Sequence, residues 1–364
     1  MKQARRWSPC VDHRGPATAE FFERYFGDAT RRCLLIAGGG FDPRSTITAR
    51  ALAAHAGDRL EGLFVREERR APARRLITAA ERHVQELQAL VPRSRIVSLD
   101  ILASDNAVVG GRNAVELLRQ ERFENVTDVL VDMSALSIGT SFPILRYLLE
   151  AAGQAGGPRN VHALVVSVPA VDERRRRVSN DVVSLVHSFH GTLRLHSQQE
   201  SARLWIPQLS VPKMAALDRI HAAVPFDDVC PILPFPSKNP RAADHVAEHF
   251  LEQLERTWDV DARNVIHAAE DDPIDVYRTI LDIEEQRRTV FEDRSVVVLS
   301  PVGTKAVALG SLMAALERDL PVVYVEALQY DAPPKELQVP ADAELLHVWL
   351  HGDAYRPHAP RVTP

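Results

Sequence analysis

Loops rich in glycine, hydroxyl and basic residues follow several of the apolar stretches, and their residue types suit an anionic ligand. One such loop runs from Ser300 to Lys305, after the apolar stretch Val296–Leu299 and before residues with helical spacing. At the start of such a helix, the free backbone N–H groups and the positive end of the helix dipole favour binding of an anion. We expect ligand contacts from Ser300, Gly303, Thr304 and Lys305. The alternative interpretation is a plain turn with a solvated lysine, because the first glycine of a Walker A loop is missing.

A second loop combines three consecutive glycines with further hydrogen-bond donors. It follows the apolar stretch Cys33–Ala37 and precedes a helical pattern that runs through Ala56. Glycines in this position let a backbone wrap a phosphate or a ribose, although they also serve a tight turn. We call this loop, residues 38–45, the glycine loop. We expect it to bind the ligand through Gly38, Gly39, Gly40, Asp42, Arg44 and Ser45.

Two further loops have a similar composition. The loop after Asp128–Asp132 resembles the Ser300–Lys305 loop, which suggests a faint internal repeat, and its candidate ligand residues are Ser134, Gly139, Thr140 and Ser141. The loop after Val229–Leu233 is expected to take the position that the glycine loop has in the first half. Its candidates are Ser237, Lys238, Asn239 and Arg241.

Strand and helix patterns alternate along most of the chain, which positions these loops. Strands are expected at 33–37, 60–65, 95–99, 128–132, 161–168, 229–233, 264–268, 296–299 and 322–325, with helices between them. Such alternation is typical of parallel sheets with helices on both faces. The predicted fold class is therefore α/β, with two Rossmann-like halves, each a mostly parallel doubly wound sheet. The loops should lie at the carboxyl ends of the strands, where such folds bind ligands.

The expected domain organisation follows the changes in this pattern. We expect an N-terminal arm at 1–30, a first Rossmann-like domain at 31–172, and a connecting segment at 173–226. A second Rossmann-like domain is expected at 227–330 and a C-terminal tail at 331–364. The connecting segment includes the arginine run 174–177 and two short strand-like pieces around Trp205.

Composition limits the class of protein. The 364 residues carry a net charge of −5, which gives no general attraction to nucleic acid, and the sequence has no apolar run of about eighteen residues that could span a membrane. Three widely spaced cysteines and the lack of a signal-peptide pattern favour a cytoplasmic protein. The histidines show no ligand spacing, so we expect no metal. Only five of the 44 basic residues are lysines, and two of these, Lys238 and Lys305, stand in candidate loops.

With these loops placed, the chain resembles the CARF-like group of Rossmann-type domains, which sense nucleotide second messengers in prokaryotic antiviral defence. In that group, a loop after the first strand and a Gly-Thr-Lys motif after the fourth strand frame the ligand. The corresponding positions here are 38–45 with 139–141, and 237–241 with 303–305. The resemblance implies a nucleotide-binding sensor or an assembly subunit of bacterial origin, which could form an oligomer or bind a protein partner. Val302 replaces the usual second glycine, and Ser141 replaces the lysine of the motif.

The glycine loop also resembles parts of two enzyme families. Gly39-Gly40-Phe41-Asp42 matches part of the loop of PP-loop ATP pyrophosphatases, and Gly40-Phe41-Asp42-Pro43 is similar to a segment of nucleotidylyltransferases. The first match lacks serines at their usual positions, and the second lacks the His-x-x-His or His-x-Gly-His motif. No nucleophile–base pair can be named, so we expect a binding protein and keep an ATP-using enzyme as the alternative.

Overall fold

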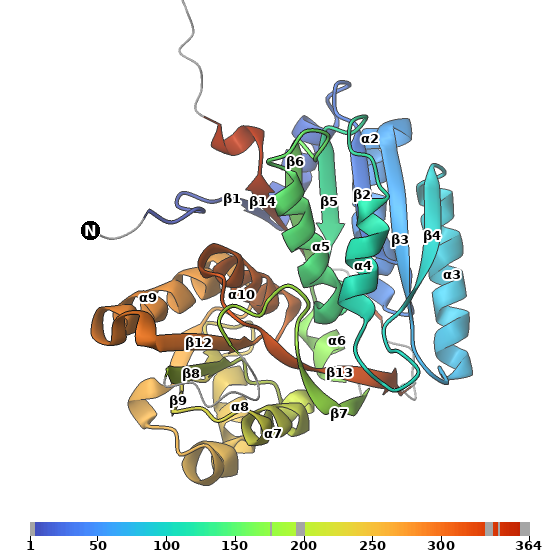
Figure 1. Ribbon diagram of the computed structural model, residues 1–364. Helices are drawn as coiled ribbons and strands as arrows, with labels where there is room; N and C mark the ends of the chain where they lie inside the picture. The colour runs from blue at the N-terminus through green and yellow to red at the C-terminus, as the bar shows by residue number, and fades with distance from the viewer. Residues whose placement is uncertain (1–3, 175–176, 194–200, 332–337, 341–342, 357–364) are drawn as a thin grey trace, which may run out of the picture.

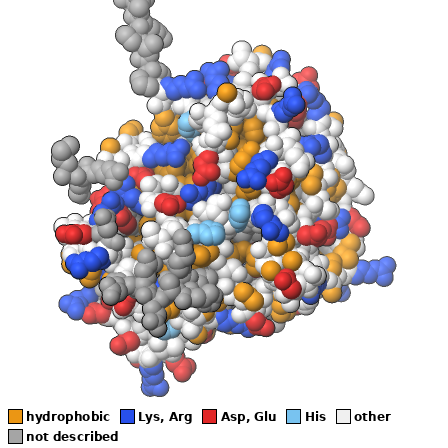
Figure 2. Space-filling model, in the orientation of Figure 1, with side chains coloured by type: hydrophobic (Ala, Val, Ile, Leu, Met, Phe, Trp, Pro, Cys, Tyr) orange, Lys and Arg blue, Asp and Glu red, His pale blue; other side chains and the backbone are white. Residues whose placement is uncertain are grey.

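The computed structural model of the 364-residue chain describes residues 4–174, 177–193, 201–331, 338–340 and 343–356. The strands form a large sheet in the first half of the chain and a smaller system of strands in the second half (Figure 1). On the face drawn in Figure 2, acidic and basic side chains are interspersed, as suits a net charge of only −5.

The first sheet has seven strands in the order β1-β14-β6-β5-β2-β3-β4. Its centre is parallel, because β2 pairs in parallel with β3 and β5, β3 with β4, and β5 with β6. At one edge, β14 is antiparallel to β6 and β1 is antiparallel to β14. The strands are β1 (Val11–Arg14), β2 (Cys33–Gly38), β3 (Leu60–Glu68), β4 (Ser94–Asp100), β5 (Asp128–Asp132), β6 (Asn160–Ser167) and β14 (Glu344–His351).

Helices cover both faces of this sheet. Apolar residues of α4 and α5 pack with alternate residues of β2 and β5 in one core cluster. Residues of α2 and α3 pack with the intervening residues of β2 in another cluster, as the period of two in a strand requires. The helices are α2 (Ile47–Ala56), α3 (Arg74–Leu90), α4 (Gly110–Arg119) and α5 (Ile138–Ala151). The expected doubly wound arrangement of the first half is confirmed.

The second half repeats this plan with fewer residues. β8 pairs in parallel with β12 and β9, and β10 pairs in parallel with β11. Single bridges join the end of β8 to β10 and the end of β12 to the start of β13. These elements are β8 (Ala202–Pro207), β9 (Asp228–Val229), β10 (Ile232–Pro234), β11 (Ile266–Ala268), β12 (Ser295–Ser300) and β13 (Val323–Tyr330), with α7 (Met214–Ala223), α8 (Ala242–His249), α9 (Pro273–Phe291) and α10 (Lys305–Arg318). A second Rossmann-like half is therefore present.

The two halves exchange their last strands. β7 (Arg177–Leu185) follows β6 in the chain but pairs antiparallel with β13 of the second half. Conversely, β14 follows β13 in the chain and closes the first sheet against β6. The expected connecting segment 173–226 thus supplies β7, β8 and α7, and the expected tail supplies β14. Of the arginine run, residues 175 and 176 lie outside the described residues.

The N-terminal arm packs on the first sheet. Besides β1 it forms α1 (Pro16–Phe21) and a π-helical turn (Phe22–Phe26), whose phenylalanines join the core with Leu52 and Leu130. Within the described ranges, no helix is long and apolar enough to cross a bilayer.

A chain of three histidines crosses this part of the sheet. His13 Nδ1 lies 3.0 Å from His347 Nδ1, and His347 Nε2 lies 2.9 Å from His162 Nδ1. His162 Nε2 then lies 3.1 Å from Oδ1 of the buried Asp128. Burial, together with the neighbouring histidines, lowers the pKa of His347 well below its usual range. The exchanged strand β14 is therefore held to its neighbours by polar as well as apolar contacts.

Candidate functional site

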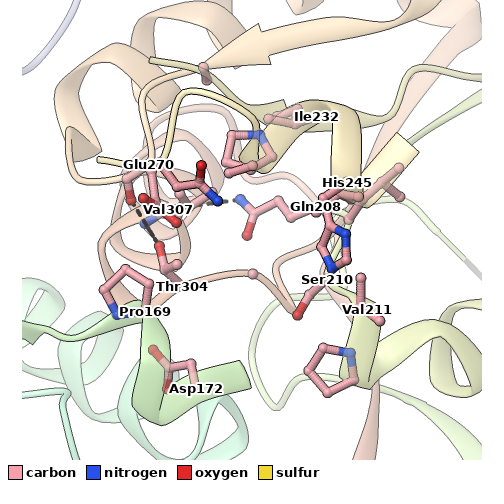
Figure 3. Close-up of a pocket in the computed structure, with 18 of the residues that line it drawn as sticks. Pro169, Asp172, Gln208, Ser210, Val211, Ile232, His245, Glu270, Thr304 and Val307 are labelled. Carbon is pink, nitrogen blue, oxygen red and sulfur yellow. Dashed lines mark hydrogen bonds between the residues drawn. The ribbon is translucent and has the colours of Figure 1, made fainter. Parts of the chain in front are cut away.

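A cavity of about 980 Å³ lies at the carboxyl ends of the second-half strands (Figure 3). Its walls come from the ends of β8, β10 and β11 and from the loop before α10, which is where parallel α/β sheets bind ligands. Helix α6 (Pro169–Arg174) of the first half closes one side. The polar residues that line the cavity are Asp172, Gln208, Ser210, Lys238, Asn239, Arg241, His245, Glu248, Glu270 and Thr304.

Gln208 forms the floor of the cavity just after β8. Its backbone N–H donates to the Ser300 carbonyl at 3.1 Å, which continues the pairing of β8 with β12. Its side chain is 2% exposed and donates from Nε2 to the Val307 carbonyl at 3.1 Å and to the Ser311 hydroxyl. Its Oε1 is buried and has no partner within the protein. The floor therefore presents a buried acceptor to whatever enters the cavity.

The start of α10 forms a second wall. Thr304 is the N-cap, and its hydroxyl accepts from the Val307 N–H at 3.4 Å and donates to the Glu270 carbonyl at 2.9 Å. Gly303 lies beside Gln208, and a Cβ added to it would stand 3.4 Å from Gln208 Oε1. Both Gly303 and Thr304 line the cavity, as the sequence-based hypothesis requires of ligand-binding residues.

Lys305 points away from this cavity. Its Nζ donates to the carbonyl of Leu136, in the loop after β5 of the first half. Lys305 is absent from the lining residues of this cavity, and its contact with the Leu136 carbonyl joins the two halves. The phosphate contact expected of Lys305 stays a prediction. Ser300 also differs from expectation, because its buried hydroxyl accepts from Trp205 Nε1 at 2.9 Å and donates to the Val323 carbonyl at 2.9 Å.

Basic residues gather on the wall formed by the loop after β10. Lys238 pairs with Glu344 at 3.0 Å, and its side chain is still about half exposed. Arg241 is exposed and precedes the first turn of α8, while His245 stands one turn further along that helix. Asn239 supports the loop by accepting from the Arg241 N–H at 3.1 Å. Ser237 donates to the Asn239 carbonyl and does not line the cavity.

The glycine loop of the first half is packed against its own surroundings. A Cβ on Gly38 would stand 2.8 Å from the Ala135 carbonyl oxygen, so glycine here serves the close approach of two backbones. Arg44 is fully buried and pairs with Asp42 at 2.9 Å and with Asp172 at 2.9 Å. Ser45 donates to the Asp42 carbonyl at 2.5 Å. The expected donors of this loop, Arg44 and Ser45, are therefore engaged within the protein.

Side chains also fill the neighbouring space above β3. Only about 60 Å³ remains in the cavity lined by Gly40, Phe41 and residues 66–70. Arg69 pairs with Glu67 at 2.8 Å and with Glu326 at 3.1 Å, and it lies over the Tyr330 ring. Although burial opposes the charge of Glu67, the Arg69 guanidinium and a hydrogen bond from the Ser137 N–H lower its pKa. An internal ion-pair network thus occupies the first-half counterpart of the cavity.

The other first-half candidates are likewise engaged or covered. Ser134 donates to Asp132 and accepts from the Val166 N–H at 2.7 Å, and Ser141 donates to the Ser137 carbonyl at 2.8 Å. The Thr140 hydroxyl lies 3.0 Å from that of Ser137. Gly139 faces Tyr324 of the second half, and a Cβ added to Gly139 would overlap the Tyr324 hydroxyl. Both first-half loops do lie at the same edge, because β2 and β5 are neighbours in the sheet.

One correspondence drawn from the sequence is wrong. The loop 237–241 follows β10, whereas the first strand of the second half is β8, which runs through the centre of its sheet. The structural counterpart of the glycine loop is therefore 208–213, which contains no glycine. Both loops lead through a 3₁₀ turn, Pro43–Thr46 or Val211–Lys213, into a ten-residue helix.

Sequence reasoning missed six polar residues that line the cavity, namely Asp172, Gln208, Ser210, His245, Glu248 and Glu270. The apolar run Leu204–Ile206 before Gln208 was a usable signal for a strand end, but it lay in a stretch assigned to the connection. Nothing in the local pattern pointed to Asp172, which reaches the cavity because α6 of the first half is placed beside the second half.

No family model matches the sequence, and no curated protein matches it. Two solved structures illustrate the similarities found. A METTL16 MTase domain matches with 12% identity and a TM-score of 0.24 over 43% of this chain and 53% of that chain. A delta-N METTL16 MTase domain matches with 12% identity and a TM-score of 0.23 over 42% of this chain and 64% of that chain. This chain thus spans less than two thirds of either domain, and the likeness carries no conclusion about function.

Proposed function

We propose that the protein binds a nucleotide or another phosphorylated small molecule in the second-half cavity. The observation that carries this proposal is a cavity of about 980 Å³ with basic residues on one wall. This wall, called the outer wall below, is formed by the loop after β10 and the start of α8, and it holds Lys238, Arg241 and His245. The volume suits a ligand of nucleotide size. Its position at the carboxyl ends of parallel strands is the usual ligand position of such sheets.

The arrangement of charge supports an anionic group at the outer wall. Lys238 and Arg241 belong to one short loop, and both keep part of their surface exposed, so a phosphate can reach them without a large desolvation cost. Lys238 would exchange its contact with Glu344 for the ligand. Release of Glu344, which begins β14, would then connect binding to the strand that closes the first sheet.

We further propose a sensing or assembly role of the CARF-like kind in prokaryotic signalling or antiviral defence. Support comes from contacts that join the halves beside the cavity. Asp172 lines the cavity and also pairs with Arg44 of the glycine loop, and Lys305 reaches the Leu136 carbonyl from the same loop that supplies Thr304. A ligand that moved either contact would change how the halves meet.

The alternative is an ATP-using enzyme built on Gly38–Asp42. Because Asp42 pairs with Arg44 and accepts the Arg44 N–H at 3.0 Å, its carboxylate already has structural partners, which makes binding the better-supported function. Sustained conversion of ATP to ADP or AMP by the purified protein, lost in a folded Asp42→Asn variant, would favour the enzyme.

Calorimetric titration with inorganic phosphate, AMP and ATP tests the proposal. The double variant Lys238→Ala/Arg241→Ala should bind AMP or ATP about ten- to a hundredfold more weakly, as expected for lost hydrogen bonds to a charged group. Arg50→Ala/Arg263→Ala is the matched control, because both arginines are exposed and lie outside the cavity. The proposal fails if no probe binds, or if both double variants bind with wild-type affinity.

A further inference from the structure

The orientation of the Gln208 amide is set by its neighbours. Nε2 faces the Val307 carbonyl at 3.1 Å, and a carbonyl oxygen can only accept a hydrogen bond. The flipped amide would place two acceptors together, so the nitrogen must face α10 and Oε1 must face the other way. Figure 3 shows this oxygen on the side of the amide that faces away from Val307, toward the region between Thr304 and Ser210.

Oε1 is therefore a buried acceptor that the protein leaves for something else. This oxygen has no hydrogen-bond partner within the protein, even though Gln208 is buried and only 2% exposed. Buried polar atoms are nearly always paired, and an exception in a cavity calls for a ligand or a bound water. Gly303 keeps the approach open, because a larger residue would bring its side chain to within 3.4 Å or less of this oxygen.

The floor and the outer wall thus favour different groups. A phosphate oxygen beside Oε1 would place an acceptor against an acceptor, whereas an N–H or O–H group would complete its hydrogen bonding. The cationic groups Lys238 and Arg241 stand on the loop after β10, whereas Gln208 follows the end of β8. A ligand with one donor end and one anionic end matches both walls.

We propose that Gln208 Oε1 accepts a hydrogen bond from an uncharged donor of the ligand, either an exocyclic amine of a base or a sugar hydroxyl, while the phosphate lies toward Lys238 and Arg241. This inference rests on the proposed function and narrows it. Gln208 then makes the cavity specific for nucleosides that carry phosphate, and inorganic phosphate alone should bind far more weakly.

The test removes the acceptor and the donor separately. AMP, IMP, 2′-deoxy-AMP and 3′-deoxy-AMP are titrated into wild-type protein and into Gln208→Leu, which has no acceptor. Gln208→Leu should weaken AMP binding about ten- to a hundredfold, the range for leaving one polar group unpaired. One of the altered nucleotides should bind wild-type protein more weakly than AMP does, by a similar factor. The same nucleotide should bind the Gln208→Leu variant with the affinity that AMP has for that variant. Loss with IMP identifies the amine, and loss with a deoxynucleotide identifies the hydroxyl.

Ser311→Ala is the matched control, because it removes a partner of Nε2 and leaves both Oε1 and the Val307 contact in place. It should keep most of the affinity for AMP. Equal affinity of folded Gln208→Leu and wild type for AMP overturns the inference while the proposed function stands. If Gln208→Leu does not fold, equal affinity of the wild type for all four nucleotides overturns it. Failure of these nucleotides, of ATP and of inorganic phosphate to bind wild-type protein rejects the proposed function itself.

Discussion

The two halves share a strand order but differ in how the carboxyl ends of their strands are packed. Among the described residues, the cavity lined by Gly40, Phe41 and residues 66–70 at the carboxyl end of β3 holds about 60 Å³, whereas the cavity at the corresponding strand ends of the second half holds about 980 Å³. In the first half, Arg69 and Arg44 lie in the interior with carboxylates around them. In the second half, the cations stay on the outer loop and the floor keeps an unpaired acceptor.

This difference teaches that a glycine-rich loop by itself says little about which half binds a ligand. The three glycines of the first half accompany a loop closed by internal ion pairs, while the loop 208–213 borders the open cavity without any glycine. In the first half these strand ends carry an internal ion-pair network, and in the second half they border a cavity, which is where we propose that the ligand binds. The predictions below test this division.

The largest expected effect is on stability, from Arg44→Ala in the closed half. The substitution removes the Arg44 ion pairs of the buried Asp42 and of Asp172, which should lower the free energy of unfolding by about 3–5 kcal/mol. Urea unfolding monitored by fluorescence measures the change. Arg50→Ala removes an exposed arginine and should stay within about 0.5 kcal/mol. Equal stability of the two variants would mean that the first-half network is not structural.

A smaller effect is expected from Lys305→Met, which keeps the apolar stem and removes the donor to the Leu136 carbonyl. Loss of this contact should lower the free energy of unfolding by about 1–3 kcal/mol, the cost of an unsatisfied buried polar group. Ligand affinity should change less than twofold if Lys305 joins the halves. A tenfold loss of affinity for AMP with unchanged stability would return Lys305 to the binding site.

Acidification should weaken the closure of the first sheet. The pKa of His347 is lowered by burial, so at low pH the unfolded chain binds a proton that the folded protein excludes. Stability from this group is therefore complete above the unfolded pKa of about 6.5 and falls as the pH drops below it, by at most about 1.4 kcal/mol per pH unit. His13, whose pKa is also lowered by burial, adds to the slope.

The measurement is urea unfolding at pH 7, 6 and 5. His347→Gln should flatten the pH dependence, whereas His249→Gln, a change at an exposed position on α8, should leave it as in wild type. Identical slopes for all three proteins would show that the histidine chain does not titrate with folding.

The smallest expected effect belongs to Gly40→Ala. A Cβ at this position meets nothing within 4 Å, and the residue does not have a positive φ. Alanine should therefore stabilise the fold slightly, by about 0.4–1 kcal/mol, because it restricts the unfolded chain. Affinity for AMP should not change. A tenfold loss of affinity would place the ligand at the glycine loop and reverse the comparison between the halves.

The sequence by itself determined the α/β class and most of the elements that carry it. Buried parallel strands read as continuous apolar runs, and the runs near Cys33, Asp128 and Ser295 begin and end within about a residue of the observed strands. The edge of the sheet at which the loops gather follows from parallel pairing alone. Lys238, Asn239, Arg241, Gly303 and Thr304, which the sequence places after strand ends, line one cavity in the structure.

Only the tertiary structure decided the strand exchange and which side chains remain available to a ligand. β7 follows β6 in the chain but pairs with β13, and β14 follows β13 but pairs with β6. No local sequence pattern encodes these pairings. Whether Arg44 or Lys305 meets a ligand, a carboxylate or a carbonyl depends on partners more than a hundred residues away. Residue type sets what a side chain can bind, but its availability is decided by the groups that packing brings within hydrogen-bond distance.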